Sequence, residues 1–134
     1  MTSFPLKIVT PDGLIYDGQA EELIVRSTTG DVAILAGHIS YVTPLGMGRA
    51  VVVADGQRRT AACIGGMLSM VNGEATLVPT TFEWADEIDV QRAEASYQRA
   101  NKVLRDKDAS DTDVRLAEAR LHRALVRKSV ASYK

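Results

Sequence analysis

The sequence predicts an α+β protein, in which an N-terminal antiparallel β-sandwich over residues 1–84 precedes a C-terminal antiparallel two-helix hairpin over residues 85–134. All four prolines and all ten glycines lie before residue 80, so the signals that interrupt regular structure are confined to the first part. Short apolar segments in that part alternate with turn residues, as in strands. After residue 84, apolar and small residues recur at spacings of three and four, which is the period of a helix.

Turn chemistry separates the predicted strands. The first strand ends at Pro11-Asp12-Gly13, in which proline presets φ and glycine permits a positive φ. Asn72-Gly73 joins two later segments through a two-residue loop, which is a strong hairpin signal. The predicted strands are residues 6–9, 14–16, 22–27, 32–35, 49–54, 58–64, 67–71 and 74–78. So many short strands at this spacing predict a sandwich or a barrel.

Two helical stripes follow. The stripe positions are Ala93, Tyr97, Ala100 and Leu104 in the first helix, and Val114, Ala117, Leu121, Ala124 and Leu125 in the second. Residues 106–111 form a polar linker, and Ser110 with Asp113 resembles the capping box that starts a helix. Isolated helices of this length depend on tertiary packing. We therefore expect the hairpin to lie against the sandwich, a ligand or another protein.

Arginines flank both stripes on the same angular side, and we call these five residues the arginine edge: Arg92, Arg99, Arg120, Arg123 and Arg127. Side chains on the same side of an antiparallel helix pair meet across the seam. Folding near residue 109 places Arg92 opposite Arg127, and Arg99 within reach of Arg120 and Arg123. Like charges this close are destabilising. Either neighbouring acids, Glu94 and Glu118, neutralise them, or a polyphosphate does so through paired hydrogen bonds to guanidinium.

Composition narrows the class of protein. The net charge of −1 gives no general attraction to nucleic acid or to an anionic membrane surface. The first residues lack the features of a signal peptide, and no apolar run is long enough to span a bilayer. Cys63 is the one cysteine, which fits a reducing compartment, and its apolar surroundings predict an inert core thiol.

Several segments in order resemble the epsilon subunits of F-type ATP synthases. The opening strand and turn of that family look like residues 9–13, and its Gly-His-Ile-Pro segment is similar to residues 37–39 followed by 42–45. Residues 65–68 match its glycine pair before a late strand. Residues 88–93 fit the Ile/Leu-Asp-x-x-Arg-Ala motif associated with ATP binding in bacterial members. Ala36 and Ser40 stand where the family usually has prolines around the Gly-His-Ile segment.

The resemblance implies a non-catalytic subunit of the central stalk, without a metal. The sandwich would hold the gamma subunit and rest on the polar loops of the c-ring, with Asp31 facing those loops and His38 in a loop of the same interface. The complex would lie at the cytoplasmic face of a bacterial plasma membrane, so this chain would meet the membrane only through the complex. Neither His38 nor His122 has neighbours that predict metal binding or a catalytic triad.

The resemblance also implies that the hairpin regulates the enzyme. Folded down, the hairpin would bind ATP; extended, its second helix would enter the catalytic head of beta and alpha subunits and inhibit hydrolysis. Carried over residue by residue, the ATP site comprises Glu83, Ile88, Asp89, Arg92, Ala93, Arg99, Arg123 and Arg127. The arginines would hold phosphates, whereas Glu83 and Asp89 would address the base or orient an arginine.

Two alternatives remain at this point. In the first, the same subunit is a mechanical coupler only, and its arginines pair with Glu94, Glu118 and the acidic surface of a catalytic subunit. In the second, the chain is a small β-sandwich enzyme with a helical lid. The sequence has no nucleophile elbow, P-loop or metal-ligand pattern that would favour the enzyme.

Overall fold

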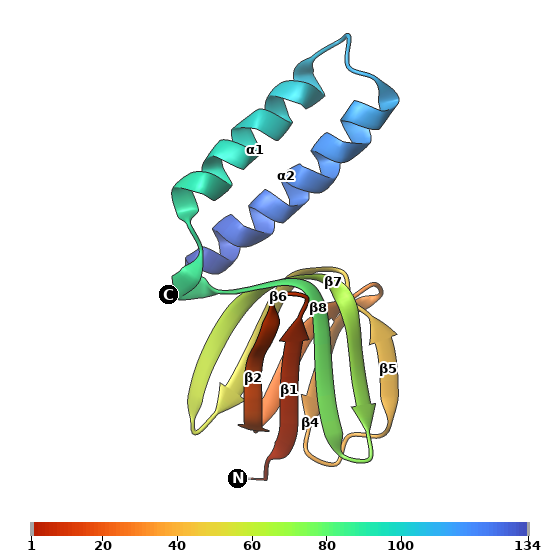
Figure 1. Cartoon of the computed structure of the whole chain (residues 1–134), viewed down its shortest axis with the longest axis vertical. Coiled ribbons are helices and arrows are strands. Elements are labelled where there is room, and N and C mark those ends of the chain that lie inside the picture. The colour runs from red at the N-terminus through yellow and green to blue at the C-terminus, as the bar shows by residue number, and fades with distance from the viewer. Residues whose placement is uncertain (1, 134) are drawn as a thin grey trace. The chain divides into compact units, whose positions relative to one another are not determined.

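The computed structural model describes residues 2–133 and divides the chain into two compact units, Met1–Trp84 and Ala85–Lys134. The first unit consists of strands and the second of helices (Figure 1). The strands are β1 (Phe4–Thr10), β2 (Gly13–Ala20), β3 (Glu22–Ser27), β4 (Gly30–Leu35), β5 (Tyr41–Pro44), β6 (Met47–Ala54), β7 (Gln57–Val71) and β8 (Glu74–Trp84). A short 3-10 turn, η1 (Ala85–Glu87), precedes α1 (Val90–Arg105) and α2 (Asp111–Ala131).

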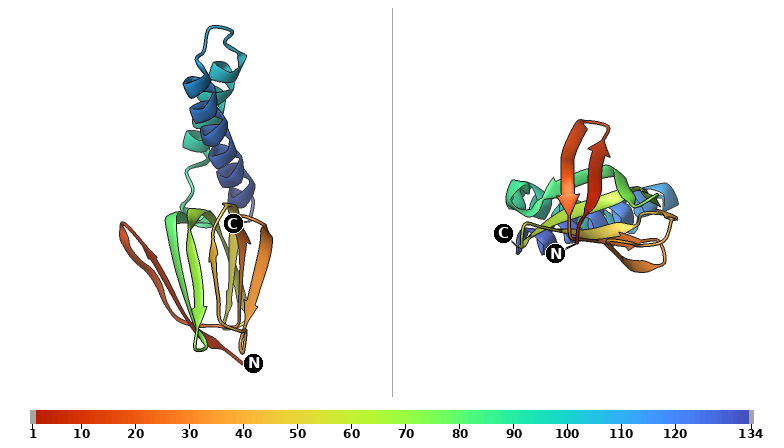
Figure 2. Two further views of the ribbon diagram at one scale, coloured as in Figure 1. Left: turned by 90° about the vertical axis from the view of Figure 1, so that its right-hand side faces the viewer. Right: turned by 90° about the horizontal axis from the view of Figure 1, so that it is seen from below.

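The strands form one sheet in the order β2-β1-β8-β7-β6-β3-β4, with β5 paired to β7 off this path. The sheet curves back on itself as a sandwich (Figures 1 and 2). The fold class predicted from the sequence is confirmed, with one difference in strand direction. Strands β1 and β8 are parallel, with Leu6 opposite Ala75, whereas the other pairs are antiparallel. Strands this far apart in the chain can pair in either direction, so local sequence signals do not reveal the relative direction of β1 and β8.

The glycine pair Gly65-Gly66 lies inside β7, where the sequence predicted a break between two strands. Both glycines have positive φ, 68° and 100°. The first half of β7 pairs with β6 and the second half with β5, so the pair lies where β7 changes partners. A Cβ at Gly66 would lie 2.0 Å from the carbonyl oxygen of Val78 on β8. Glycine is therefore required for the close approach of two strands, and it bends β7 without ending it.

The core of the sandwich comes from one face of each of its main strands. In β1, Phe4, Leu6 and Ile8 are buried and alternate with exposed or half-buried positions. Leu23, Val25 and Ile34 meet them from the opposite part of the sheet, and Leu68, Met70, Leu77 and Phe82 complete the cluster. Cys63 belongs to the same cluster and is 3% exposed, as predicted for an inert core thiol.

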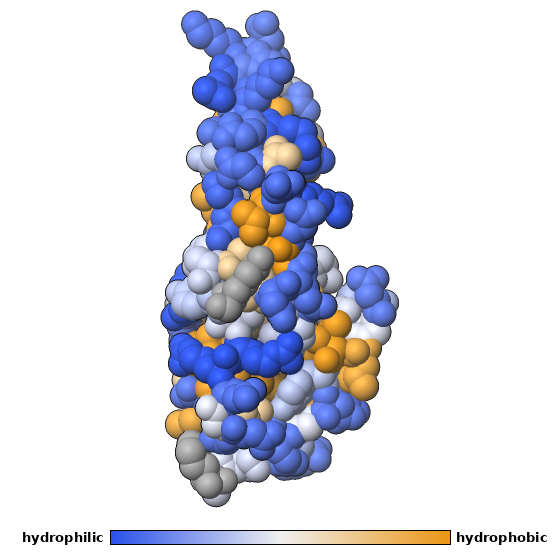
Figure 3. All heavy atoms as spheres, turned by 90° about the vertical axis from the view of Figure 1, so that its left-hand side faces the viewer, coloured by the Kyte–Doolittle hydropathy of each residue, from blue (hydrophilic) through white to orange (hydrophobic). Residues whose placement is uncertain are grey.

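Two antiparallel helices form the second unit, and the face of this unit seen in Figure 3 is mainly hydrophilic with a few apolar groups. Ser110 caps α2, because its hydroxyl oxygen accepts a hydrogen bond from the backbone N–H of Asp113 at 3.1 Å. Within the part of the chain that the structure describes, no helix is long and apolar enough to cross a bilayer. The seam between α1 and α2 contains four buried alanines, Ala93, Ala100, Ala117 and Ala124. Small side chains let the helices approach closely, yet each buries little apolar area.

Candidate functional site

The start of α1 contains the Ile-Asp-x-x-Arg-Ala motif, and its residues have identifiable structural roles. Asp89 is the N-cap: its Oδ1 accepts a hydrogen bond from the backbone N–H of Arg92 at 3.0 Å. The backbone carbonyl of Asp89 accepts the first helical hydrogen bond, from Ala93 at 3.0 Å. Ile88 and Ala93 are buried, with exposures of 4% and 3%. The motif therefore begins the helix and places Ala93 in the seam, while the Arg92 side chain remains exposed.

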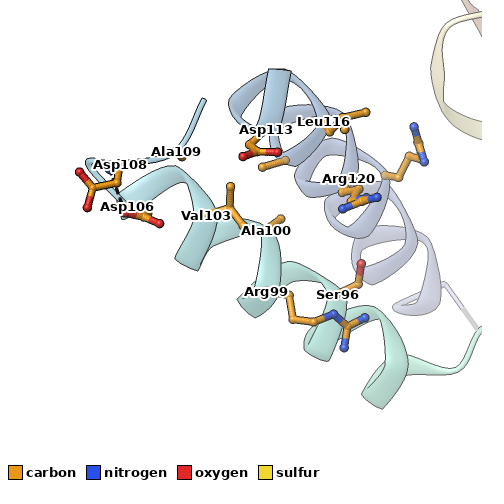
Figure 4. Close-up of a pocket in the computed structure, with 12 residues that line it drawn as sticks. Ser96, Arg99, Ala100, Val103, Asp106, Asp108, Ala109, Asp113, Leu116 and Arg120 are labelled. Carbon is orange, nitrogen blue, oxygen red and sulfur yellow. Dashed lines mark hydrogen bonds between the residues drawn. The ribbon is translucent and has the colours of Figure 1, made fainter. Parts of the chain in front are cut away.

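Between α1 and α2 lies a groove of about 690 Å³, which we call the arginine groove (Figure 4). Its cationic lining consists of Arg99 from α1 and of Arg120 and Arg123 from α2. Its other lining residues are Ser96, Ala100, Val103, Asp106, Asp108, Ala109, Asp113, Leu116 and Ala117. Figure 4 shows Arg99 and Ser96 on α1 and Arg120 on the neighbouring α2. The arginine groove thus brings Arg99 together with Arg120 and Arg123, as antiparallel folding of the arginine edge predicted.

The three guanidinium groups of the groove have no carboxylate partner among the described residues. Within residues 2–133, none of Arg99, Arg120 and Arg123 forms an ion pair with an aspartate or glutamate. Three carboxylates line the same groove near the loop between the helices, from Asp106, Asp108 and Asp113. Asp106 instead accepts a hydrogen bond from the backbone N–H of Asp108 at 2.9 Å. The groove therefore holds separate cationic and anionic parts, and its arginines can accept an external anion.

The acids of the groove were not found from the sequence, although helical spacing contained a signal. Asp113 lies seven residues before Arg120, which is two turns along the same side of α2. Asp106 and Asp108 belong to the loop, whose position relative to the helix seam depends on how the chain turns. Asp106 and Asp108 were predicted only as part of a polar linker, and Asp113 only as part of the start of the second helix.

The other predicted residues of the nucleotide site lie outside this groove. Arg92 is two turns before Arg99 on α1, and Arg127 is about one turn after Arg123 on α2, so both share the side of the helix on which the groove opens. Neither lines the groove itself. Glu83 belongs to the sandwich unit, where it pairs with Ala62 in the β7–β8 ladder.

Glu94 does not neutralise an arginine, contrary to one interpretation of the sequence. Its Oε2 lies 2.5 Å from Lys128 Nζ, and its Oε1 accepts a hydrogen bond from Gln98 at 2.9 Å. The hydrogen bond from Lys128, followed by that from Gln98, lowers the pKa of the Glu94 carboxyl. Five residues separate Glu94 from Arg99, which turns its side chain about 140° away around the helix. This geometric offset explains why Glu94 meets a different cation.

In the sandwich, Asp31 is held by a neighbouring cation. It lies on β4 opposite Arg26 of β3, and Arg26 Nε is 2.6 Å from Asp31 Oδ1. The hydrogen bond to Asp31, and then its negative charge, raise the pKa of the Arg26 guanidinium. The side chain of Arg26 lies over Gly48, where a Cβ would come within 2.6 Å of Arg26 Cβ. Asp31 is therefore an exposed acid whose position is fixed by a cross-strand pair.

His38 lies beyond the other end of β4. Its Nδ1 is 2.8 Å from the carbonyl oxygen of Ile39, and its ring centroid is 5.9 Å from that of Tyr41. Because β4 runs from Gly30 to Leu35, Asp31 lies near one end of the strand and His38 follows the turn at its other end. No group of three or more metal-ligating side chains is found among residues 2–133.

Comparison with known proteins agrees with the two-unit organisation. Residues 3–85 match the family described as ATP synthase, Delta/Epsilon chain, beta-sandwich domain, and residues 86–132 match its long alpha-helix domain. The ATP synthase epsilon chain of Ruminococcus albus is 40% identical over 135 residues, covering 100% of both chains. That of Bacillus velezensis is 42% identical and covers 98% of both.

Solved structures share the fold. A chain in the cryo-EM structure of the Euglena gracilis mitochondrial ATP synthase, OSCP/F1/c-ring, aligns with a TM-score of 0.85 at 18% identity, covering 100% of this chain and 83% of that one. A chain from the central stalk/c-ring structure of the Tetrahymena thermophila enzyme aligns with a TM-score of 0.62 at 9% identity, covering 95% of each. With the family match across both units and relatives of this identity over nearly their whole length, the chain belongs to the ATP synthase epsilon-chain family.

Proposed function

We propose that this chain is a non-catalytic subunit of the central stalk of a proton-translocating ATP synthase, and that its helical hairpin regulates ATP hydrolysis by binding ATP. The sandwich binds the gamma subunit and rests on the polar loops of the c-ring, with Asp31 and His38 at those contacts. The complex lies at the cytoplasmic face of a bacterial plasma membrane. Support comes from the family and from the structural neighbours, of which one belongs to an OSCP/F1/c-ring structure and the other to a central stalk/c-ring structure.

The observation that carries the ATP proposal is the arginine groove. It gathers three guanidinium groups that have no ion-pair partner within residues 2–133. Guanidinium matches phosphate geometry through paired N–H···O bonds, and a polyphosphate removes the mutual repulsion of the three charges. The groove volume of about 690 Å³ lies within the range typical of small-molecule sites. Arg92 and Arg127 add two further cationic side chains on the same side of the hairpin as the groove. The motif at Ile88–Ala93 begins α1, the helix that carries Arg92 and Arg99.

Closure of the hairpin gives ATP its regulatory effect. The groove is formed by both helices, so its arginines are gathered only while α1 and α2 are paired. A ligand that binds only the closed form stabilises it by mass action, about 2.7 kcal/mol at a hundredfold excess over Kd. When the hairpin opens, α2 extends toward the catalytic beta and alpha subunits and inhibits hydrolysis. ATP thereby favours the non-inhibitory state.

One observation favours the second candidate, a mechanical coupler that binds no nucleotide. Asp106, Asp108 and Asp113 balance the formal charge of the three arginines within the same groove. In this case the groove is a solvated, internally balanced surface, and the arginines of α2 serve only contacts with a catalytic subunit. Regulation of hydrolysis would then depend only on contacts between the hairpin and other subunits of the complex.

Calorimetry of the purified chain with ATP and ADP separates the two candidates. The ATP proposal expects saturable binding of ATP and weaker binding of ADP, because fewer phosphate oxygens reach the arginines. Absence of ATP binding by the wild-type chain overturns this proposal and leaves the mechanical coupler.

Removing residues 85–134 tests whether the two units have separate functions. The remaining sandwich should still bind the gamma subunit, and inhibition of hydrolysis should be lost.

A further inference from the structure

The edge of the hairpin opposite the arginine groove contains a contact between the helices that involves no ligand. Lys128, near the end of α2, places its Nζ 2.5 Å from Glu94 Oε2 and 4.3 Å from the ring centroid of Tyr97. Both partners lie on α1, one turn apart, so a single ammonium group joins two side chains of the other helix. Gln98 holds the second carboxylate oxygen of Glu94 at 2.9 Å. We call Glu94, Tyr97 and Lys128 the Lys128 clamp.

The clamp is separate from the arginine groove. None of its three residues lines the groove. Lys128 lies five residues after Arg123, which turns it about 140° around α2. Glu94 is displaced by the same angle from Arg99 on α1. A nucleotide in the groove therefore has no direct contact with the clamp, and each edge of the hairpin closes by its own chemistry.

Because the alanine seam contributes little apolar burial, an additional contact such as the Lys128 clamp can change how much of the hairpin population is closed. The four seam alanines bury little area, and α1 and α2 are joined covalently only through a polar loop. The Glu94 and Lys128 side chains are 45% and 33% exposed, so solvent and salt weaken their attraction without abolishing it. The aromatic face of Tyr97 adds an attraction that needs no second charge. Contacts of this modest size shift a two-state equilibrium when the remaining interface is weak.

We propose that the Lys128 clamp holds the hairpin closed in the absence of nucleotide and so sets the threshold at which the ATP switch operates. The role of the clamp in regulation rests on the proposed function, whereas closure of the hairpin is a property of the isolated chain. The clamp sets the fraction of hairpins that are already closed before ATP binds. Breaking it lowers the binding-competent fraction and weakens apparent ATP affinity by the same factor.

The test measures the distance between the helices in the full chain without nucleotide. Spin labels at Ala95→Cys and His122→Cys lie on exposed positions outside the clamp and the groove, and the native Cys63 is buried. Lys128→Met keeps the aliphatic stem and removes the charge. We expect the ratio of open to closed hairpin to rise about fivefold, from the combined loss of an exposed ion pair and a cation–π contact.

Further variants separate a clamp from general loss of helix stability. Glu94→Gln should have a smaller effect, and adding it to Lys128→Met should cause little further opening, because the pair is already broken. The charge swap, Glu94→Lys with Lys128→Glu, should restore part of the closure. Glu118→Gln and Lys102→Met, on exposed positions outside the clamp, serve as matched controls and should match wild type.

Identical label distances in wild type and Lys128→Met would overturn the clamp, as would equal opening in the Lys102→Met control. A wild-type hairpin that is already open would overturn it too. Failure of the wild type to bind ATP would instead remove the proposed nucleotide switch, and the nucleotide-free distances would still decide whether the clamp exists.

Discussion

Replacing Arg123 with alanine removes one of the three guanidinium groups that line the arginine groove, and it tests the ATP proposal directly. In the structure this side chain has no carboxylate partner within residues 2–133, so its loss breaks no internal ion pair. Its contribution to ATP binding should therefore appear almost entirely as lost affinity. A hydrogen bond to a charged group contributes about 1.5–3 kcal/mol, which corresponds to a roughly 10- to 150-fold weaker Kd.

The assay is calorimetric titration of the purified full-length chain with ATP. Arg99→Ala and Arg120→Ala should weaken binding to a similar extent, because both line the groove. Arg123→Lys keeps the charge but loses the planar fork, so its affinity should fall between those of wild type and Arg123→Ala. Arg115→Ala is the matched control: it removes an arginine of α2 that does not line the groove, and it should leave Kd unchanged.

The acidic part of the groove supplies a test of opposite sign. Asp113→Asn removes a negative charge near the proposed phosphate position and should tighten ATP binding, increasingly so at low salt. Equal ATP affinity in wild type and in all three groove alanine variants would refute the placement of the phosphates. Weakening by Arg115→Ala of the same size would show a general charge effect in place of a site.

Other consequences concern stability and reactivity. Gly66→Ala should destabilise the protein by roughly 3 kcal/mol or more, measured by denaturant unfolding, because its Cβ has no space beside the backbone of Val78; Gly18→Ala, with ordinary contacts, should cost far less. Burial raises the pKa of the Cys63 thiol to about 12. A thiol reagent at about pH 8 should therefore label Cys63 only after unfolding, and rapid labelling of the native chain would contradict its burial. The pKa of Glu94 is lower in the folded chain than in the unfolded one, so its ion pair stabilises the closed hairpin above about pH 4.3 and is lost as the pH falls through the lower folded value. Label distances should show that opening, and a hairpin equally closed in acid would argue against it.

Local sequence signals predicted most elements because their causes are local. The strand at Glu22–Ser27 was predicted with the bounds that the structure shows. Ser110 was predicted to start α2, and the observed hydrogen bond to its hydroxyl confirms this cap. Local signals failed where a residue serves a distant contact. Gly65-Gly66 reads as a turn, yet it is a bend inside β7 required by the backbone of β8. The four-residue β5 was missed because it is short and contains Pro44.

The candidate site was predictable to the extent that helical spacing determines it. The angular positions of Arg99, Arg120 and Arg123 follow from a period of 3.6 residues, and antiparallel folding then brings them together. The ion-pair partner of Glu94 was not predictable from helical spacing. One of the two interpretations placed Glu94 beside the arginines, but Glu94 contacts Lys128, because the two edges of a helix pair have separate sets of neighbours.

The sequence by itself determined the two-part organisation, the helical stripes, the Ser110 cap of the second helix and the cationic character of one edge of the hairpin. These properties depend on residues within a few positions of each other, where backbone geometry leaves few choices. The tertiary structure alone decided the parallel pairing of β1 with β8, the seating of Arg26 over Gly48 and the ion pair across the hairpin. It also decided which charges of the arginine groove have no ion-pair partner within residues 2–133. Each of these depends on distances between segments far apart in the chain, which are set only when the core and the alanine seam have packed.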